Sequence, residues 1–341
     1  MKITEPKFWW NFKPSLQMRL ISFPFGLILK ILNFFRYKLL KETNLIKPVI
    51  CVGNFVVGGQ GKTPFVRYLR KLFQDFNYKT VVISSGYGGK LAYPKIITSS
   101  DSSNECGDEA LLHARDGPTI VSKNRVDALK ILKQNIFDLV ILDDGFQNPS
   151  IHKNLNIIMV DASKGIGNNL LIPFGPMRES LNFALKRIDV IILINSVNKN
   201  HQSIDCILKS WKGLVINAEY ETYINDDIND DINEDFIVFS GISNPEKLSY
   251  GLEKIGAKID KHFIFPDHKN ITEDNAKEIY EYSKSKKLRV ITTEKDHIKL
   301  KGSKENSYRE RLYLNSIIAR VRIRLDNKIL INFLRERKLI K

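Results

Sequence analysis

Cysteine is scarce in this chain of 341 residues, which has three copies, Cys51, Cys106 and Cys206. Because they are odd in number and far apart, they predict neither a disulfide framework nor a zinc site. Disulfides persist in oxidising compartments, so a chain with so few cysteines is expected to work inside the cell, under reducing conditions.

The sequence also lacks a long uninterrupted apolar run. Its most apolar stretch, Leu27–Lys41, is broken by Lys30, Asn33 and Arg36 before it reaches the roughly 20 residues that a membrane span needs. No small-residue cleavage site follows this stretch, so a signal peptide is not expected. Apolar residues make up 43% of the chain and charged residues 27%, which excludes a fibrous or wholly disordered protein. At this length, two domains are expected.

Acidic residues are outnumbered, with 38 Asp and Glu against 53 Lys and Arg, for a formal net charge of +15. Residues 1–47 carry nine Lys or Arg against two Glu, so +7 of this charge lies in the first segment, together with nine aromatic residues. Basic chains are typical of proteins that meet nucleic acid, anionic membranes or phosphorylated substrates. The alternative is a charge that serves solubility alone.

The stretch Leu27–Lys41 has the periodicity of an amphipathic helix. One face carries Ile28, Ile31, Leu32, Phe35 and Leu39, and the opposite face carries Lys30, Asn33, Tyr37 and Lys41. A basic amphipathic helix with Trp and Phe anchors is typical of a membrane interface, and the alternative is a first helix packed on the protein's own core. We predict that residues 1–47 form an N-terminal amphipathic segment at a membrane interface.

From Pro48 the sequence alternates between short β-branched runs and segments of helical length, which predicts a doubly wound α/β domain over residues 48–219. The runs are apolar on both faces, as in a buried, mostly parallel sheet. The expected strands are Val49–Val52, Thr80–Ser84, Thr119–Ser122, Leu139–Leu142, Ile157–Val160 and Val190–Ile194, and the expected helices include Pro64–Phe76 and Arg125–Gln134.

A second, smaller α/β domain is predicted over residues 220–341. Its expected strands are Phe236–Ser240, His262–Phe265, Val290–Thr293 and Ile317–Ile323. The acidic repeat Ile224–Asp235, which reads INDD-INDD-INED, lacks the central glycine and the ligand spacing of a calcium loop. Residues 224–235 are therefore predicted to be a solvated linker or hairpin loop.

The strongest local signal is the glycine-rich run that ends in Gly-Lys-Thr after the first strand, which is the context of a P-loop. Lys62 is expected to reach the β- and γ-phosphates of a nucleotide, and Thr63 to hold Mg²⁺ through its hydroxyl. The strict pattern has glycine at the position of Val56, so the match is incomplete, and the alternative is an ordinary turn. The expected ATP-binding residues are Val56, Val57, Gly58, Gly59, Gln60, Gly61, Lys62 and Thr63.

Paired carboxylates end another predicted strand. Asp143 and Asp144 follow Leu139–Leu142 at the carboxyl edge of the sheet, where α/β proteins bind ligands. Two adjacent aspartates are costly to bury unpaired, so a nearby cation is their natural explanation, and a solvent-facing turn is the alternative. We therefore predict a Mg²⁺ site formed by Thr63, Asp143 and Asp144.

Three further clusters are weaker signals when taken alone. The run Ser84–Gly89 follows a strand and is a candidate backbone nest for an anion. Asp108 precedes a helical stretch, where capping is the commoner use of an aspartate. His268 follows a strand of the second domain, where a structural role is the commoner one.

Together and in this order, these segments resemble one family, the tetraacyldisaccharide 4′-kinases, also called lipid A 4′-kinases. The likeness runs from Trp9-Trp10 to Thr293-Glu294-Lys295-Asp296, nearly the whole chain. The segments that carry it are Gly53-Asn54 with the P-loop, Gly86-Tyr87-Gly88-Gly89, Gly107-Asp108-Glu109, Asp143-Asp144-Gly145-Phe146-Gln147, Gly175-Pro176-Met177-Arg178-Glu179, Gly241-Ile242 with Asn244-Pro245, and Phe265-Pro266-Asp267-His268. A P-loop without its first glycine is a habit of this family.

The resemblance implies a kinase that transfers the γ-phosphate of ATP to the 4′-hydroxyl of tetraacyldisaccharide 1-phosphate and so forms lipid IVA, in lipid A biosynthesis. It implies ATP and Mg²⁺ as cofactors and a hinged two-domain protein on the cytoplasmic face of the inner membrane, attached peripherally. We expect a monomer whose partners are the lipid A precursor and the anionic membrane surface. No nucleic acid is expected.

The resemblance also implies roles for individual residues. Lys62 is the implied catalytic residue of the phosphate loop. Asp143 and Asp144 are implied to bind Mg²⁺ and to act on the phosphates. Asp108 is the implied base for the sugar hydroxyl, paired with His268 from the second domain. The residues implied near the lipid-sugar head group are Gln147, Arg178 and Glu179.

Three positions depart from the family pattern: Ser85 stands where Arg is usual, Ala110 where Pro is usual, and Asn148 where His is usual. A different class of function stays open on the residues alone, namely a P-loop ATPase switch that partitions onto membranes and has no lipid acceptor. A basic nucleic-acid-binding module is the third class, but no signature of a nucleic-acid fold is present.

Overall fold

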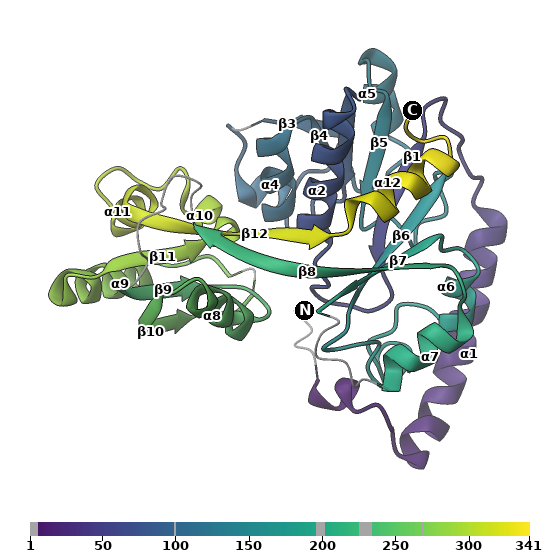
Figure 1. Ribbon diagram of the computed structural model, residues 1–341, viewed down its shortest axis with the longest axis horizontal. Helices are drawn as coiled ribbons and strands as arrows, with labels where there is room; N and C mark the ends of the chain where they lie inside the picture. Colours follow the sequence, from purple (N-terminus) through teal and green to yellow (C-terminus); the bar gives the residue numbers. More distant parts are fainter. Residues whose placement is uncertain (1–5, 99, 196–201, 225–233, 268) are drawn as a thin grey trace. The chain divides into compact units, whose positions relative to one another are not determined.

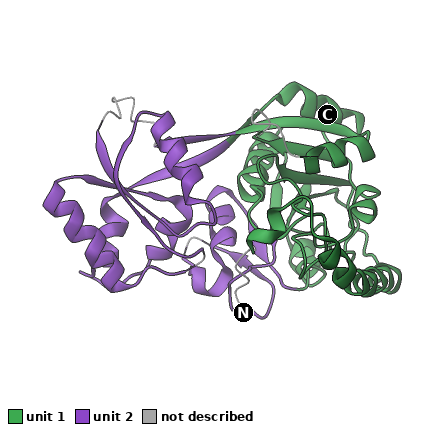
Figure 2. Cartoon of the chain, turned by 90° about the horizontal axis from the view of Figure 1, so that it is seen from below, with its two compact units in different colours: residues 1–83, 124–219, 323–341 green, residues 84–123, 220–322 purple. Residues whose placement is uncertain are grey.

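The computed structural model describes residues 6–98, 100–195, 202–224, 234–267 and 269–341 (Figure 1). The chain forms two compact units, which Figure 2 distinguishes by colour. Unit 1 consists of residues 1–83, 124–219 and 323–341, and unit 2 of residues 84–123 and 220–322. Each unit is described by itself below.

These units differ from the predicted division at residues 47 and 219. Residues 84–123, expected in the first domain, belong to unit 2, and residues 323–341, expected in the second, belong to unit 1. Residues 1–47 belong to unit 1 and form no unit of their own. The chain passes between the units four times, after residues 83, 123, 219 and 322.

Unit 1 is built on a parallel sheet in the strand order β8-β7-β6-β1-β5-β2. Its strands are β1 (Val49–Asn54), β2 (Thr80–Ser84), β5 (Leu139–Asp143), β6 (Leu155–Asp161), β7 (Val190–Ile194) and the first half of β8 (Leu214–Ile224). The predicted doubly wound α/β fold is confirmed. Successive strands lie on opposite sides of β1, so β1 marks the switch point, where a ligand crevice is expected at the carboxyl ends of the strands.

The helices of unit 1 are η1 (Lys7–Trp10), α1 (Leu16–Leu39), α2 (Lys62–Asp75), α5 (Ala128–Gln134), α6 (Leu181–Leu185), α7 (Gln202–Ser210) and α12 (Asn327–Glu336). Helix α2 begins directly after Gly61, whose φ of +73° places it in the left-handed region that favours glycine. Its apolar side chains recur at helical spacing, and Phe65, Leu69 and Phe73 are fully buried.

Helix α1 starts earlier than its periodicity predicted, at Leu16 rather than Leu27, because Pro24 and Gly26 do not end it. Ser15 caps the helix, and its Oγ accepts a hydrogen bond from the Met18 N–H at 3.2 Å. At 24 residues, α1 is long and apolar enough to cross a membrane by length and composition alone, contrary to the predicted interruption.

Helix α1 runs along the outside of the rest of unit 1 (Figure 1), and its apolar face is exposed. Ile28, Leu32 and Leu39 on this face are 55%, 58% and 76% exposed, whereas Ser22 is buried and Tyr37 is half-buried. A first helix packed on the protein's own core would instead bury this apolar face. The observed orientation therefore contradicts the core-packing alternative for this face within the described residues.

Unit 2 contains parallel strands in the order β10-β9-β11-β12 and an antiparallel pair, β3 and β4. The strands are β3 (Lys95–Ile97), β4 (Thr119–Val121), β9 (Asp235–Ser240), β10 (Lys258–Ile264), β11 (Arg289–Thr293) and β12 (Ser316–Leu325). The helices are α3 (Ser103–Cys106), α4 (Asp108–Asp116), α8 (Pro245–Lys254), α9 (Glu273–Lys286), α10 (Glu294–Leu300) and α11 (Tyr308–Asn315).

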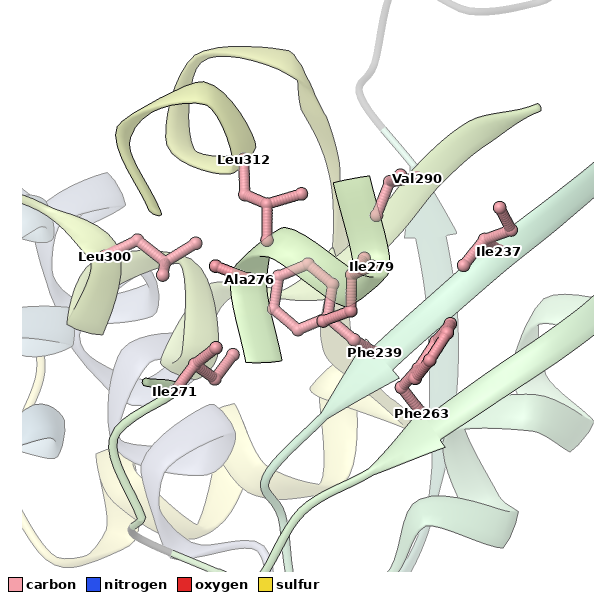
Figure 3. Close-up of a cluster of buried hydrophobic side chains, with 9 residues drawn as sticks. All are labelled: Ile237, Phe239, Phe263, Ile271, Ala276, Ile279, Val290, Leu300 and Leu312. Carbon is pink, nitrogen blue, oxygen red and sulfur yellow. The ribbon is translucent and has the colours of Figure 1, made fainter. Parts of the chain in front are cut away.

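The core of unit 2 lies between these strands and the helices that follow them. Figure 3 shows the cluster, in which side chains from β9, β10 and β11 meet those of α9, α10 and α11. Its members are Ile237, Phe239, Phe263, Ile271, Ala276, Ile279, Val290, Leu300 and Leu312. Most of the acidic repeat, residues 225–233, and His268 lie outside the described residues.

Candidate active site

The glycine-rich loop of unit 1 is fixed by contacts along its length. The Asn54 side chain donates a hydrogen bond from Nδ2 to the Gly58 carbonyl at 3.3 Å, and Gln60 Oε1 accepts one from the Asp161 N–H at 2.8 Å. Gly58 and Gly61 have φ values of +100° and +73°, a region in which glycine is not strained. These contacts shape the turn that brings the chain to the N-terminus of α2.

The missing first glycine has a structural explanation. Val56 is buried and forms an isolated antiparallel bridge with Met177, and the neighbouring Val57 N–H donates to the Pro176 carbonyl at 2.9 Å. Phe55 O accepts from the Arg178 N–H at 3.0 Å. Backbone contacts therefore join the loop to residues 176–178, and the Val56 side chain adds buried apolar surface there that glycine would lack.

Asp144 is the electrostatic centre of the site. It follows β5, and the Arg178 guanidinium donates to both of its carboxylate oxygens, at 2.7 and 3.1 Å. Lys62 Nζ lies 3.7 Å from its Oδ2. Burial alone would raise the pKa of Asp144, but the charges of Lys62 and Arg178 outweigh it and hold that pKa below its usual value.

The predicted head-group residues lie beside this pair. Gln147 Nε2 donates to the Asn54 carbonyl at 2.9 Å and to Glu179 Oε1 at 3.4 Å, while its Oε1 accepts from Arg178 Nη1 at 3.3 Å. Glu179 is buried and forms an ion pair with Arg187. Unit 1 thus brings together the predicted Lys62, Asp143, Asp144, Gln147, Arg178 and Glu179, with Thr63 at the second position of α2.

Gly53 allows the end of β1 to lie close to the turn after β5. A Cβ on Gly53 would lie 2.4 Å from the Cβ of Phe146, so the end of β1 can approach the turn after β5 only because Gly53 has no side chain. Asp143, the last residue of β5, pairs in register with Val52 of β1 and is buried. The two strand ends that carry the phosphate loop and the carboxylates are therefore in direct contact.

Two arginines of the site were not predicted. Arg125 is buried and donates from Nη2 to the Asp143 carbonyl at 3.3 Å, and burial lowers its pKa against the raising effect of Asp143 and Asp144. Arg187 stacks within 4.4–4.5 Å of the ring centres of Tyr37, Phe146 and Phe183. Each is one arginine beside other charged residues, Lys123 and Asp127 around Arg125 and Lys186 and Asp189 around Arg187, a pattern that carries no signal without the fold.

The carboxylates fit a divalent cation held in the manner of P-loop proteins. Among the described residues, no group of three His, Cys, Asp or Glu side chains is arranged to hold a metal ion unaided. Magnesium is usually bound by one or two carboxylates together with substrate phosphates and water, so a dedicated cage is not required. Asp143 and Asp144 at a strand end, with the Thr63 hydroxyl on α2, match this donor set.

Unit 2 holds the remaining predicted residues. Asp108 is the first residue of α4, rather than its cap, and follows Gly107, whose φ is +86°. A Cβ on Gly107 would lie 2.5 Å from the Tyr87 carbonyl oxygen, so this entry into α4 requires glycine. His268 lies outside the described residues, and its neighbour Asp267 pairs with Lys295 at 3.5 Å.

The candidate anion nest is not supported by the loop that follows β2. The Gly89 N–H donates to the Gly86 carbonyl at 2.9 Å, and the Lys90 N–H donates to the Glu105 carbonyl at 2.8 Å. The Gly86 N–H faces Ser84 Oγ at 3.4 Å. Because these donors already have partners within the protein, the loop fixes the approach to α4 instead of surrounding an anion.

A pocket of about 330 Å³ lies in unit 1 where α1 ends. It is lined by Tyr37, Leu40, Glu42, Phe146, Pro149, His152, Lys153, Asn156 and Arg187. Lys153 Nζ donates to the Asn148 carbonyl, and burial lowers the pKa of this lysine. Asn156 Oδ1 is buried and has no hydrogen-bond partner among the described residues.

Comparison with known proteins gives one result throughout. The family model for tetraacyldisaccharide-1-P 4′-kinase matches residues 15–338. A tetraacyldisaccharide 4′-kinase of Rickettsia akari is 37% identical over 306 residues, which is 90% of this chain and 91% of the relative. One from Rickettsia conorii is 35% identical over 306 residues, 90% of this chain and 92% of the relative.

A solved structure agrees with these matches. The crystal structure of LpxK from Aquifex aeolicus in complex with ATP superimposes with a TM-score of 0.72. The likeness covers 94% of this chain and 99% of that one, at 26% identity. The fold, and not only local motifs, is therefore shared.

Replacement of Arg178 by methionine is expected to lower the free energy of unfolding at pH 7 by about 1–3 kcal/mol, because Asp144 loses a charged hydrogen-bond donor. The lowered pKa of Asp144 means that this stabilisation is complete above the ordinary carboxyl pKa and is lost as the pH falls through the folded value. The deficit should therefore shrink below about pH 4.

Urea unfolding of both proteins at pH 7 and pH 3 measures this change. Arg335→Met removes an exposed arginine and serves as the control. An equal deficit at both pH values would contradict the assigned pairing.

Proposed function

The chain belongs to the tetraacyldisaccharide 4′-kinase family, and we propose that the phosphate loop and the Asp144 cluster of unit 1 carry its ATP chemistry. It is an ATP-dependent kinase of lipid A biosynthesis that transfers the γ-phosphate to the 4′-hydroxyl of tetraacyldisaccharide 1-phosphate. The observation that carries the assignment of residues is the approach of Lys62 and Arg178 to Asp144 at the carboxyl ends of the strands.

In this proposal the loop from Val56 to Thr63 binds the phosphates of ATP through its backbone N–H groups. Lys62 neutralises charge on the β- and γ-phosphates. Thr63, Asp143 and Asp144 would hold Mg²⁺, which when bound offsets the charge that develops on the transferred group. With nucleotide bound, Lys62 exchanges its contact with Asp144 for the phosphates, and Arg178 keeps the carboxylate oriented.

Asp108 is the proposed base for the acceptor hydroxyl. A carboxylate within hydrogen-bond reach of the 4′-hydroxyl accepts its proton as the sugar oxygen bonds to phosphorus and the bond to ADP breaks. His268 is proposed to orient Asp108. Asp267 beside it belongs to the same unit as Asp108, so the pairing first expected across two domains becomes one within unit 2.

We propose that Gln147, Arg178 and Glu179 bind near the sugar head group and that the pocket at the end of α1 receives the anionic 1-phosphate of the acceptor. Lys153 supplies a desolvated positive charge there, and Asn156 Oδ1 is an acceptor for a sugar hydroxyl.

Helix α1 supports the proposal that the protein lies peripherally on the cytoplasmic face of the inner membrane. The exposed apolar face of α1, with basic residues around it, is suited to a bilayer that carries anionic lipid. Membrane attachment of one chain places the site next to a lipid substrate, so a monomer suffices. No observation favours the ATPase switch without a lipid acceptor.

The kinase assignment is tested by incubating the purified chain with ATP, Mg²⁺ and tetraacyldisaccharide 1-phosphate in mixed micelles. The 4′-phosphorylated product should form, and EDTA should abolish it. Asp108→Asn should reduce kcat by about 10²–10⁴-fold, because a general base contributes on that scale. ATP hydrolysis without lipid product would instead indicate the switch, and near-normal turnover by Asp108→Asn would remove the proposed base.

Serine substitution of Ile28, Leu32 and Phe35 together should weaken binding to anionic vesicles at least tenfold, since each buried apolar side chain contributes about 1.5–3 kcal/mol. Thermal stability should not change, because all three side chains are exposed. The matched control replaces the exposed Ile136, Leu314 and Tyr250 by serine. Co-sedimentation measures binding, and equal binding by both triple variants would assign the membrane contact elsewhere.

Lys153→Met should raise KM for the lipid acceptor about tenfold, the effect of losing one charged hydrogen bond, and leave KM for ATP unchanged. Lys130→Met, at an exposed site, is the control. Initial rates with each substrate varied in turn measure both constants. An unchanged acceptor KM would show that the pocket does not hold the phosphate.

A further inference from the structure

Helix α10 contains a motif to which the reaction gives no role. Thr293 caps this helix, and its Oγ1 accepts from the Asp296 N–H at 3.1 Å and donates to Asp296 Oδ2 at 2.7 Å. The helix reads EKDHIKL, yet Asp296, His297 and Lys299 are all buried. Charged side chains are rarely buried unless they are paired, so this concentration on one short helix calls for a reason.

Asp296 is held rigidly in unit 2. It is 0% exposed, and its Oδ2 also accepts from the Gly241 N–H at 2.9 Å. Its Oδ1 accepts from Lys299 Nζ at 3.0 Å. A Cβ on Gly241 would lie 3.1 Å from the same Oδ1, so the backbone approaches closely because this residue is glycine. With both oxygens occupied, Asp296 fixes the position of the lysine ammonium group.

Lys299 lies between two carboxylates. Its side chain is 1% exposed, and Nζ is 3.7 Å from Asp108 Oδ2 in addition to its hydrogen bond with Asp296. Helices α4 and α10 share an apolar cluster that includes Leu111, Leu112 and Ile298. This packing holds the lysine and the start of α4 at a fixed separation.

We propose that Lys299 is a positioning residue for phosphoryl transfer, which orients and charge-balances Asp108 while Asp296 anchors it. The proposal rests on the assignment of Asp108 as the base. The three side chains Asp108, Lys299 and Asp296 together carry a charge of −1, and transfer of the hydroxyl proton to Asp108 brings their sum to zero. Without Lys299 the carboxylates of Asp108 and Asp296 would lose the ammonium group that approaches both.

Other charged groups near this cluster have contacts of their own. Lys295 faces Asp267 at 3.5 Å, and Glu294 faces Arg320 at 3.5 Å. Arg309 donates to the Lys299 carbonyl at 2.8 Å, which supports the helix backbone and not the ammonium.

A double-mutant cycle on the full-length enzyme tests this coupling. Lys299→Met should reduce kcat 10- to 100-fold with KM for ATP unchanged, and Lys299→Arg should restore part of the loss. In an Asp108→Asn background, Lys299→Met should reduce kcat by less than threefold, because the residue through which it acts is already lost. Lys277→Met, an exposed lysine of α9, is the control and should turn over normally.

The outcomes separate the two proposals. Full turnover by Lys299→Met, or the same fold-loss in both backgrounds, overturns the positioning role. A merely structural lysine would lower the melting temperature without changing kcat per folded molecule, so kcat is normalised to the folded fraction measured by circular dichroism. Normal turnover by Asp108→Asn instead overturns the proposed base, whatever Lys299 does.

Discussion

The pairing of Asp144 with Arg178 and Lys62 is the interaction on which the site of unit 1 depends. It joins three segments that are distant in the chain: the P-loop, the turn after β5 and the segment that follows Pro176. Asp144 has a φ of +53°, an unusual value for a residue other than glycine. The bidentate guanidinium contact stabilises this conformation, so the charge pair determines backbone geometry as well as electrostatics.

Contacts on both sides of α1 fix the N-terminal part of the chain to unit 1. In η1, which precedes α1, the Trp9 carbonyl accepts from the Asn168 N–H at 2.7 Å, and Trp9 Nε1 donates to the Pro173 carbonyl at 2.9 Å. At the other end, Arg187 bonds to Tyr37 and Glu179. Polar and aromatic contacts thus fix α1, and its apolar face stays exposed. One arginine, Arg187, connects the end of this helix to Glu179.

Much of unit 1 could be predicted because its signals are local. The strands are continuous apolar runs, and the glycine loop and the paired aspartates lie at the strand ends where parallel sheets bind ligands. The start of α1 was missed because proline and glycine commonly interrupt helices. Neither Pro24 nor Gly26 interrupts α1. The apolar face was identified correctly, and only the structure could tell which way it points.

What could not be predicted depends on contacts between distant segments. Residues 84–123 join residues 220–322 in one unit, in which α4 packs on α10. Nothing in the sequence of either segment predicts that the two pack together. Nothing in the sequence distinguishes Lys299 from the other lysines, because its position beside Asp108 follows from the fold. Arg125 and Arg187 were missed for the same reason, since the sequence gives their charge but not the carboxylate or ring that each one meets.

One electrostatic rule connects these separate clusters. A kinase needs carboxylates for its metal and for its base, yet every uncompensated carboxylate repels the polyanion that it must bind. Three carboxylates of this protein have a cation next to them: Arg178 and Lys62 lie at Asp144, Arg187 at Glu179, and Lys299 at Asp296. The excess of basic residues then has two physical uses. In the first 47 residues it suits the anionic surface proposed above, and inside each unit it neutralises acids before a phosphate arrives.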